Sequence, residues 1–454
     1  MKKVALTLAA IAAATVFAPE ASAVPVFARQ TGMACSACHY QHFPLLNGFG
    51  RAFKNSGFTM MGAQGKVEGE HLDMPDRVNM GMFMTTYVQN ESGQGVGSGG
   101  ATAPAVIGTP GTGGEFSLFM GGRAAEFLGF IAEAGLGGAG ASNGTAPANF
   151  VQTGGIVGAT KMLMLFPVGD ARIGLSVHSS NGQGVAYSFE TLNTGAANTH
   201  KMMGNSGPSN QHVQAAYASQ YLGTNTAATG ASIVANNSMG FVNVGLWEMA
   251  GNALVNGANS LNLNYERVAG TFDFAGFDLG VGIQHFGGVS TVTNSSAVNA
   301  LNNNTNLTPG LLNAPNATIL DAQAQGDFAG MPVGLYVTYG RAAPSTGTDF
   351  NAFNLNSVAA GGTDKTSFNV AAEIGLIPHV ATVQVAVRMA KNGMAPLAGV
   401  DQSGDNALMV GVTYELAQNI GLSLTGTQQS GSYWDQNPTA VGKTATTLLL
   451  ETLF

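Results

Sequence analysis

The chain has 454 residues, of which only 9% are charged, and its formal net charge at neutral pH is −8. Ordinary globular proteins carry about 25% charged residues, and nucleic-acid binding needs clustered lysine and arginine. The composition is therefore unusual for a soluble protein and excludes a nucleic-acid partner. The low charge fits the wall of a β-barrel, in which successive side chains face lipid and water in turn. A water-soluble β-solenoid or an adhesin-like sandwich is the alternative.

The first 23 residues predict export. Lys2 and Lys3 form a basic start, residues 4–17 are apolar, and the A-S-A sequence at 21–23 is a cleavage signal before Val24. An uncleaved anchor is the alternative, but the apolar run is shorter than the roughly 18 residues that a spanning helix needs. We therefore expect a signal peptide over 1–23.

The mature sequence divides into two parts. Residues 24–77 form a small module of mostly helical or irregular structure, in which the polar stretch 65–77 is expected to be a linker. Residues 78–454 show the strand pattern of an outer-membrane β-barrel.

Only two cysteines occur, Cys35 and Cys38, and His39 follows them directly. In a C-x-x-C-H sequence, the two thiols add to the vinyl groups of a haem and the histidine ligates its iron. A thioredoxin-type redox pair would need a βαβ context, and a zinc site would need further soft ligands. We therefore predict one covalent haem c on Cys35 and Cys38, with His39 as the proximal iron ligand.

The sixth iron ligand is open among several residues of the module and its linker, and Met60 or Met61 is favoured because a methionine ligand raises the reduction potential. Core packing is the alternative role of each methionine. If the segment is helical, His42 should lie at the surface or contact a haem propionate. The other candidates are Met33, His71 and Met74.

Two groups of side chains have expected roles around the haem. The basic residues either pair with the haem propionates or are solvated, and the aromatic residues enclose the ring or pack an ordinary core. The basic residues are Arg29, Arg51 and Lys54, and the aromatic ones are Phe27, Phe43, Phe49, Phe53 and Phe58.

The module is too small to enclose a haem alone, so we expect it to plug the barrel lumen. An iron-contact site at Glu68, Glu70, His71, Asp73 and Asp76 is a weaker hypothesis. Lumen-facing Glu373, Arg388 and Glu415 are expected to line a water-filled wall.

After Val78, apolar and polar residues alternate with the period of a strand, as in 381–389 and in a hairpin of 408–416 and 420–427. The length accommodates about 16 antiparallel strands, with 14 or 18 also open, and the last strand ends on Phe454. Further strands are expected near 80–87, 116–123, 127–136, 156–166, 173–178, 212–221, 241–249, 261–267, 277–285, 333–341 and 368–376, and long connections at 90–114, 191–210 and 289–323.

The segment FARQTGMACSACHYQHFPLLNGFGRAFKNSGFTMMG, followed by a barrel, resembles the fused outer-membrane cytochrome–porins of iron-oxidising bacteria. The match covers about residues 24–64, and over the barrel the similarity is architectural. The resemblance implies a monohaem cytochrome that oxidises extracellular Fe(II) and passes electrons to a periplasmic cytochrome c or similar carrier. Cys35, Cys38 and His39 match the haem-binding motif of that family.

Related segments occur in other exported cytochromes, so the motif alone leaves the electron donor open. Three other functions are considered: an electron-export conduit that reduces extracellular acceptors, a solute porin with a structural or sensory haem, and a soluble β-rich haem adhesin. The reduction potential, ion conductance and behaviour on extraction would separate them.

Overall fold

A computed structural model of the chain describes residues 26–70, 72–92, 106–110, 113–136, 157–180, 185–186, 192–195, 217–225, 228–249, 261–291, 312–346, 349–440 and 442–454. The export signal expected at 1–23 lies outside these residues. None of the helices in the described ranges is long and apolar enough to cross a membrane.

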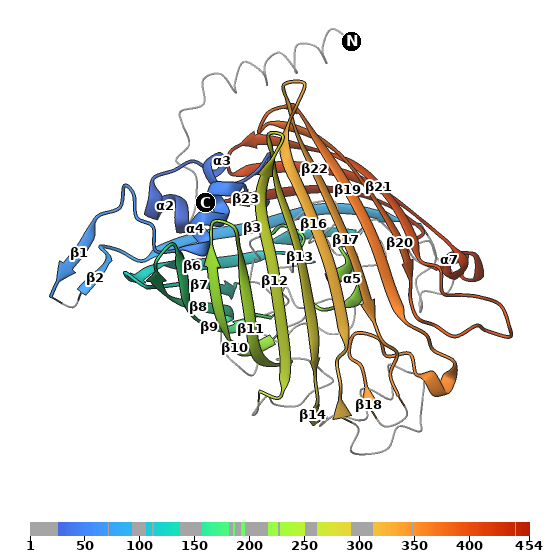
Figure 1. The fold of residues 1–454 in the computed structure, drawn as a ribbon. Coiled ribbons are helices and arrows are strands. Elements are labelled where there is room, and N and C mark those ends of the chain that lie inside the picture. The colour runs from blue at the N-terminus through green and yellow to red at the C-terminus, as the bar shows by residue number, and fades with distance from the viewer. Residues whose placement is uncertain are drawn as a thin grey trace, which may run out of the picture.

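Within the described residues, sixteen antiparallel strands close into a porin-like β-barrel (Figure 1), which confirms the expected fold. Each strand pairs with the next along the chain, and the last pairs with the first. The strands are β3 (Asn79–Glu91), β6 (Phe116–Ala125), β7 (Leu128–Gly135), β8 (Val157–Val168), β9 (Ala171–Ser180), β10 (Ala228–Asn237), β11 (Gly240–Met249), β12 (Leu263–Phe274), β13 (Phe277–Gly288), β16 (Ala317–Phe328), β17 (Met331–Ala342), β19 (Lys365–Ile377), β20 (Ala381–Lys391), β21 (Asn406–Ala417), β22 (Ile420–Ser430) and β23 (Thr444–Leu453).

The remaining elements are short. Three helices and one hairpin precede the barrel, and a few small elements lie in its connections. They are α2 (Val26–Thr31), α3 (Cys35–Cys38), α4 (Gly48–Asn55), β1 (Lys66–Gly69), β2 (Leu72–Pro75), β4 (Val106–Pro110), β5 (Gly113–Gly114), α5 (Ala218–Leu222), β14 (Ser290–Thr291), β15 (Leu312–Asn313), β18 (Asp349–Phe350), η1 (Val358–Ala360) and α7 (Ser432–Gln436).

The strands present an apolar face outward and a polar face inward. On β20, Val383, Val385 and Val387 are 38%, 42% and 37% exposed, whereas the alternating residues Gln384, Ala386 and Arg388 are buried. The same alternation places valine, leucine and isoleucine on the outside of the neighbouring strands. An apolar exterior with a polar interior is the pattern of a transmembrane β-barrel.

The two ends of the barrel differ in the length of their connections. At one end, two-residue turns such as Ala275–Gly276 and Ala329–Gly330 join the strands, with positive φ at both residues (51° and 81°, and 53° and 79°). This conformation matches the twist of paired strands. The opposite end carries the long connections, including the segment between β9 and β10. In bacterial barrels, short turns face the periplasm and long loops face outward.

Two sequence predictions in the barrel were wrong. The stretch 212–221 is not a strand where it is described, because α5 begins at Ala218 and packs Tyr221 and Leu222 into the interior. The connection expected at 289–323 contains the start of β16. On both β16 and β10, which was also missed, the outward residues other than Leu320 and Ile233 are mainly small or polar, so their alternation in hydrophobicity is weak.

Candidate functional site

Cys35, Cys38 and His39 lie on one short element of the module. The two cysteines begin and end α3, a single helical turn, and His39 follows as its C-cap. The His39 backbone N–H donates to the Cys35 carbonyl oxygen at 2.8 Å. The structure therefore brings the three residues of the motif together.

The two thiols are partly buried and are not joined in a disulfide. Burial, followed by the nearby charge of Glu415, raises the pKa of the Cys35 thiol to about 11. Burial also raises the pKa of Cys38. Both sulfurs are therefore protonated thiols near neutral pH, which does not suit a redox pair that needs a reactive thiolate.

The imidazole of His39 has a defined tautomer. Its Nδ1 lies 3.1 Å from the carbonyl oxygen of Leu45, which can only accept, so Nδ1 carries the hydrogen. Burial lowers the pKa of His39 to about 4, so the ring is neutral at pH 7. Nε2 therefore keeps its lone pair, and a backbone carbonyl on Nδ1 is a common way to orient a histidine that ligates a metal.

Asn47 and Gly50 fix α3 against α4. The Asn47 side chain caps α4 by accepting from the Gly50 N–H at 2.9 Å, and it donates to the Ala37 carbonyl oxygen at 3.0 Å. Its backbone N–H donates to the Cys38 carbonyl oxygen at 3.0 Å. A Cβ on Gly50 would lie 2.2 Å from that oxygen, so this position requires glycine. The asparagine cap was visible in the sequence as a helix-start signal, but its role was missed.

The segment around His42 is not helical, and the surface position expected for a helical segment is not found. His42 is instead 3% exposed, and its Nε2 lies 3.0 Å from the Glu373 carboxylate on β19. Its Nδ1 donates to the Phe43 carbonyl oxygen at 2.9 Å. Gln384 on β20 and Tyr336 on β17 also bond to Glu373, at 3.3 Å and 2.8 Å. This cluster, the His42–Glu373 latch, joins the module to the barrel wall.

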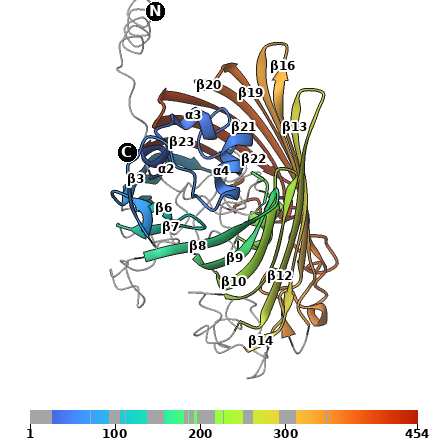
Figure 2. The same ribbon diagram turned by 60° about the vertical axis from the view of Figure 1, so that its left-hand side comes forward.

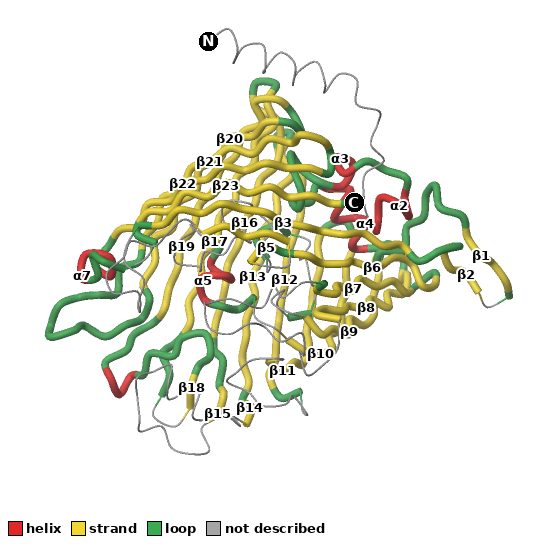
Figure 3. The backbone as a smooth tube through the Cα atoms, turned by 180° about the vertical axis from the view of Figure 1, so that it is seen from behind, coloured by secondary structure: helices red, strands yellow, loops and turns green. Residues whose placement is uncertain are grey.

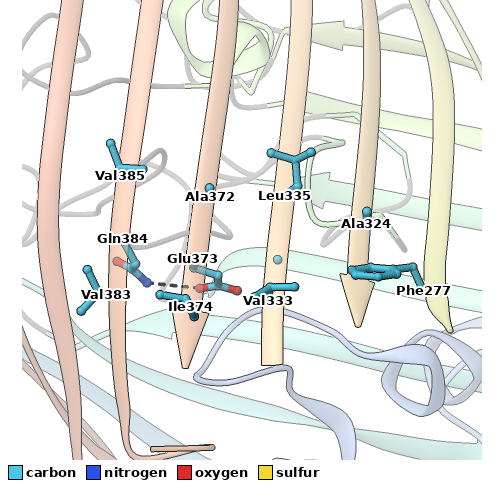
Figure 4. Close-up of a pocket in the computed structure, with 11 residues that line it drawn as sticks. Phe277, Ala324, Val333, Leu335, Ala372, Glu373, Ile374, Val383, Gln384 and Val385 are labelled. Carbon is cyan, nitrogen blue, oxygen red and sulfur yellow. Dashed lines mark hydrogen bonds between the residues drawn. The ribbon is translucent and has the colours of Figure 1, made fainter. Parts of the chain in front are cut away.

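The wall behind the latch is hollowed. An open hollow of about 340 Å³ lies over β17, β19 and β20; its lining includes Glu373 and Gln384 together with exposed residues such as Val385 (Figure 4). The rest of its lining is apolar or glycine: Phe277, Ala324, Val333, Gly334, Leu335, Ala372, Ile374, Val383 and Val385.

Other contacts place the module inside the short-turn end of the barrel, where the strands curve around its helices (Figure 2). The Arg51 guanidinium pairs with Asp278 at the start of β13, so this arginine is held by the wall and is not solvated. The Tyr40 hydroxyl lies within hydrogen-bonding distance of the carbonyl oxygens of Gly326 (2.9 Å) and Val333 (2.7 Å).

The segment between β9 and β10 also contacts the module. The Leu46 N–H donates to the Asn193 side chain at 2.7 Å, and the Asn193 amide donates back to the Leu46 carbonyl oxygen at 3.0 Å. Leu45 and Tyr217 belong to one buried cluster. The module and the inserted segment therefore meet inside the barrel.

The aromatic residues of the module divide into two groups. Phe27 stacks on Phe58 with ring centroids 4.8 Å apart and meets Phe53 edge-on at 5.0 Å. Phe43 packs edge-on against the His39 ring at 5.2 Å, while Phe49 is 39% exposed. Phe43 thus lies beside the motif.

The role of Met60 or Met61 as the sixth ligand of the haem iron stays a prediction. Met60 packs against the apolar cluster of Phe53 and Phe58, and its carbonyl oxygen accepts from the Gln30 side chain at 2.7 Å. Core packing thus accounts for its position. Met61 is partly buried in the turn that follows.

The polar stretch 65–77 is the hairpin β1–β2 and not an irregular linker. Lys66 lies 2.6 Å from Glu68 and 3.5 Å from Asp73, and Asp73 also pairs with Arg123. Their charges are thus balanced by one another, which weakens the hypothesis of an iron-contact site here. His71 lies outside the described residues. Within the described ranges, no three histidine, cysteine, aspartate or glutamate side chains gather as a metal site.

On the inner wall, Arg388 is fully buried and pairs with Asp405 at 2.8 Å, so it is not a freely solvated wall charge. Glu373 belongs to the latch, and Glu415 lies near enough to Cys35 to influence its pKa.

No protein-family model and no curated protein matches the chain. Among solved structures, it is similar to engineered forms of the Rhodopseudomonas blastica porin. A triple mutant of that porin shows 13% identity and a TM-score of 0.42, and a second mutant shows 14% and 0.43. A structure titled "Asymmetric conductivity of engineered proteins" shows 13% and 0.42. Each alignment covers 83% of this chain and 100% of the other.

Proposed function

We propose that this protein is an outer-membrane electron-transfer protein that carries one haem c on Cys35, Cys38 and His39. In this proposal it oxidises extracellular Fe(II) and passes the electron to a periplasmic carrier such as a cytochrome c. The observation that supports it best is the His39 imidazole, which is oriented by the Leu45 carbonyl so that Nε2 keeps its lone pair, and which directly follows two thiols that are not joined in a disulfide.

The residues present fit a covalently attached haem. A haem c bound there supplies one-electron redox chemistry. Cys35 and Cys38 provide the two thiols at the spacing that attachment requires, and His39 provides one axial nitrogen. Asn47 and Gly50 hold α3 in place, and the barrel wall covers the module where a small domain alone would leave it open to water.

The position of the module supports a periplasmic partner. It occupies the short-turn end of the barrel, which faces the periplasm in bacterial proteins of this architecture. The apolar exterior of the strands supports insertion into the outer-membrane lipid. A carrier protein can therefore approach the module from the periplasm without entering the barrel.

The test is stopped-flow absorbance of the oxidised protein in detergent after mixing with anaerobic Fe(II) near neutral pH. Rapid reduction of the haem bands supports the Fe(II) oxidase. Reduction by dithionite but not by Fe(II) would contradict it and favour electron export. The matched control is the Cys35→Ser, Cys38→Ser double variant, which should show no covalent haem signal.

A solute porin is the second candidate, because the inner faces of the strands are polar. Planar-bilayer conductance separates the two functions. Steady ion conductance together with failure of Fe(II) to reduce the haem would favour the porin.

A further inference from the structure

The hairpin β1–β2 projects beyond the ends of β6, β7 and β8 (Figures 1 and 3), and it has one apolar face. Val67 lies directly opposite Met74, and Leu72 follows on the same side because side chains alternate along a strand. Val67, Leu72 and Met74 are 45%, 44% and 41% exposed. Three large apolar side chains thus share one exposed surface, which we call the hairpin apolar face.

The opposite face of the hairpin is polar and turned toward the module. Glu68 lies opposite Asp73, and Lys66 bonds to both carboxylates. Asp73 pairs with Arg123 at the end of β6, and the same guanidinium donates to the Thr59 carbonyl oxygen at 3.1 Å. The polar face is therefore tied to the rim and the module, so the hairpin apolar face points away from the barrel interior.

Exposed apolar residues also begin the outward surface of the barrel, a few positions beyond the hairpin. Val78 and Met80, which follow the hairpin directly, are 60% and 45% exposed. At the neighbouring turns, Phe127 and Phe166 stack with ring centroids 4.7 Å apart and are 38% and 44% exposed. Exposed aromatic residues at the rim are typical of the level at which a barrel leaves the bilayer.

We propose that hairpin β1–β2 is a membrane-surface anchor, in which Val67, Leu72 and Met74 insert into the interfacial layer of the bilayer on the short-turn side. The polar face then meets water and the module. The bilayer is the occupant because the chain passes from this face into the lipid-facing strand β3 within a few residues, and because the Asp73–Arg123 pair holds the hairpin beside the exposed aromatic residues Phe127 and Phe166. This inference rests on the proposed membrane location and adds that the module itself contacts lipid.

Bromine quenching of tryptophan tests the anchor in the full chain, reconstituted in phosphatidylcholine vesicles with and without brominated acyl chains. Leu72→Trp places the reporter on the apolar face, and Glu68→Trp is the matched control on the polar face of the same hairpin. The native Trp247 and Trp434 are buried and give a background common to all variants. The anchor predicts strong loss of emission for Leu72→Trp and little loss for Glu68→Trp.

Val385→Trp, on the outward face of β20, separates failure of the anchor from failure of the membrane location. If Val385→Trp is quenched and Leu72→Trp is not, the anchor is wrong and the barrel still lies in the bilayer. Acrylamide quenching of Leu72→Trp is measured with and without added periplasmic protein. If only the added protein protects this tryptophan, the face binds a protein partner and the proposal is wrong. If neither reporter is quenched by the brominated chains, the membrane location itself is wrong.

Discussion

The imidazole of His42, three residues beyond His39, lies 3.0 Å from the Glu373 carboxylate, and both side chains are fully buried. One belongs to the module and the other to β19 of the barrel. Separating the two parts of the chain would leave both groups unpaired or return them to water. The latch therefore couples the position of the motif to the integrity of the barrel.

Removing one partner of the latch should loosen the module. Glu373→Ala removes the carboxylate from His42, and losing a buried hydrogen bond to a charged group costs about 1.5–3 kcal/mol. Limited proteolysis in detergent should then release a fragment that contains Cys35 and Cys38. The control is Asp364→Ala, which removes the exposed Arg341–Asp364 pair and should cost below about 1 kcal/mol. Equal protease resistance in the two variants would contradict the latch.

Gly50→Ala should impair haem attachment without unfolding the barrel. The added Cβ would lie 2.2 Å from the Cys38 carbonyl oxygen, so α3 and α4 must separate, at a cost of about 1–3 kcal/mol. The measurement is haem absorbance per chain, with heat-modifiable gel migration as the check on the barrel. Gly426→Ala on β22, where nothing lies within 4 Å of the added Cβ, is the control. Full haem content in Gly50→Ala would refute this role.

Val385→Lys should destabilise the barrel in vesicles. The side chain points outward from the middle of β20, and a lysine on the lipid face near the bilayer centre costs about 2–4 kcal/mol. Denaturant unfolding followed by intrinsic tryptophan fluorescence measures the change. Val400→Lys, at an exposed position in the connection to β21, is the control and should be nearly neutral. A similar midpoint for both variants would argue that the outward face of β20 does not contact lipid.

The ion pair between Asp73 on hairpin β1–β2 and Arg123 on β6 should weaken in acid. The hydrogen bond from Arg123 lowers the pKa of Asp73 below its ordinary value of 3.8. Because the pKa of Asp73 is lower in the folded than in the unfolded protein, its carboxylate stabilises the fold above pH 3.8. This stabilisation is lost as the pH falls through the pKa of Asp73 in the folded protein. The Leu72→Trp emission should therefore change below about pH 4. Adding Asp73→Asn should abolish that change, and an unaltered acid transition in the double variant would assign it to another group.

The fold was predictable because alternation between lipid and water leaves a period of two in the sequence, as residues 381–389 show. That signal is weak where most outward residues are small or polar, as in the missed strands β10 and β16, whose outward faces each carry one large apolar residue in the middle of the strand, Ile233 or Leu320. The motif itself was visible because attachment chemistry fixes its spacing. The latch was not, because His42 and Glu373 are 331 positions apart and meet only when the barrel closes around the module.

Covalent attachment of a haem c at Cys35 and Cys38 is tested most directly by mass spectrometry of the mature protein, produced with cytochrome c maturation and then fully denatured. We expect a chain heavier by one haem, with the added mass on the peptide that contains both cysteines, and loss of that mass in the Cys35→Ser, Cys38→Ser variant. A mature chain of unmodified mass, with both thiols still open to alkylation, would contradict covalent attachment.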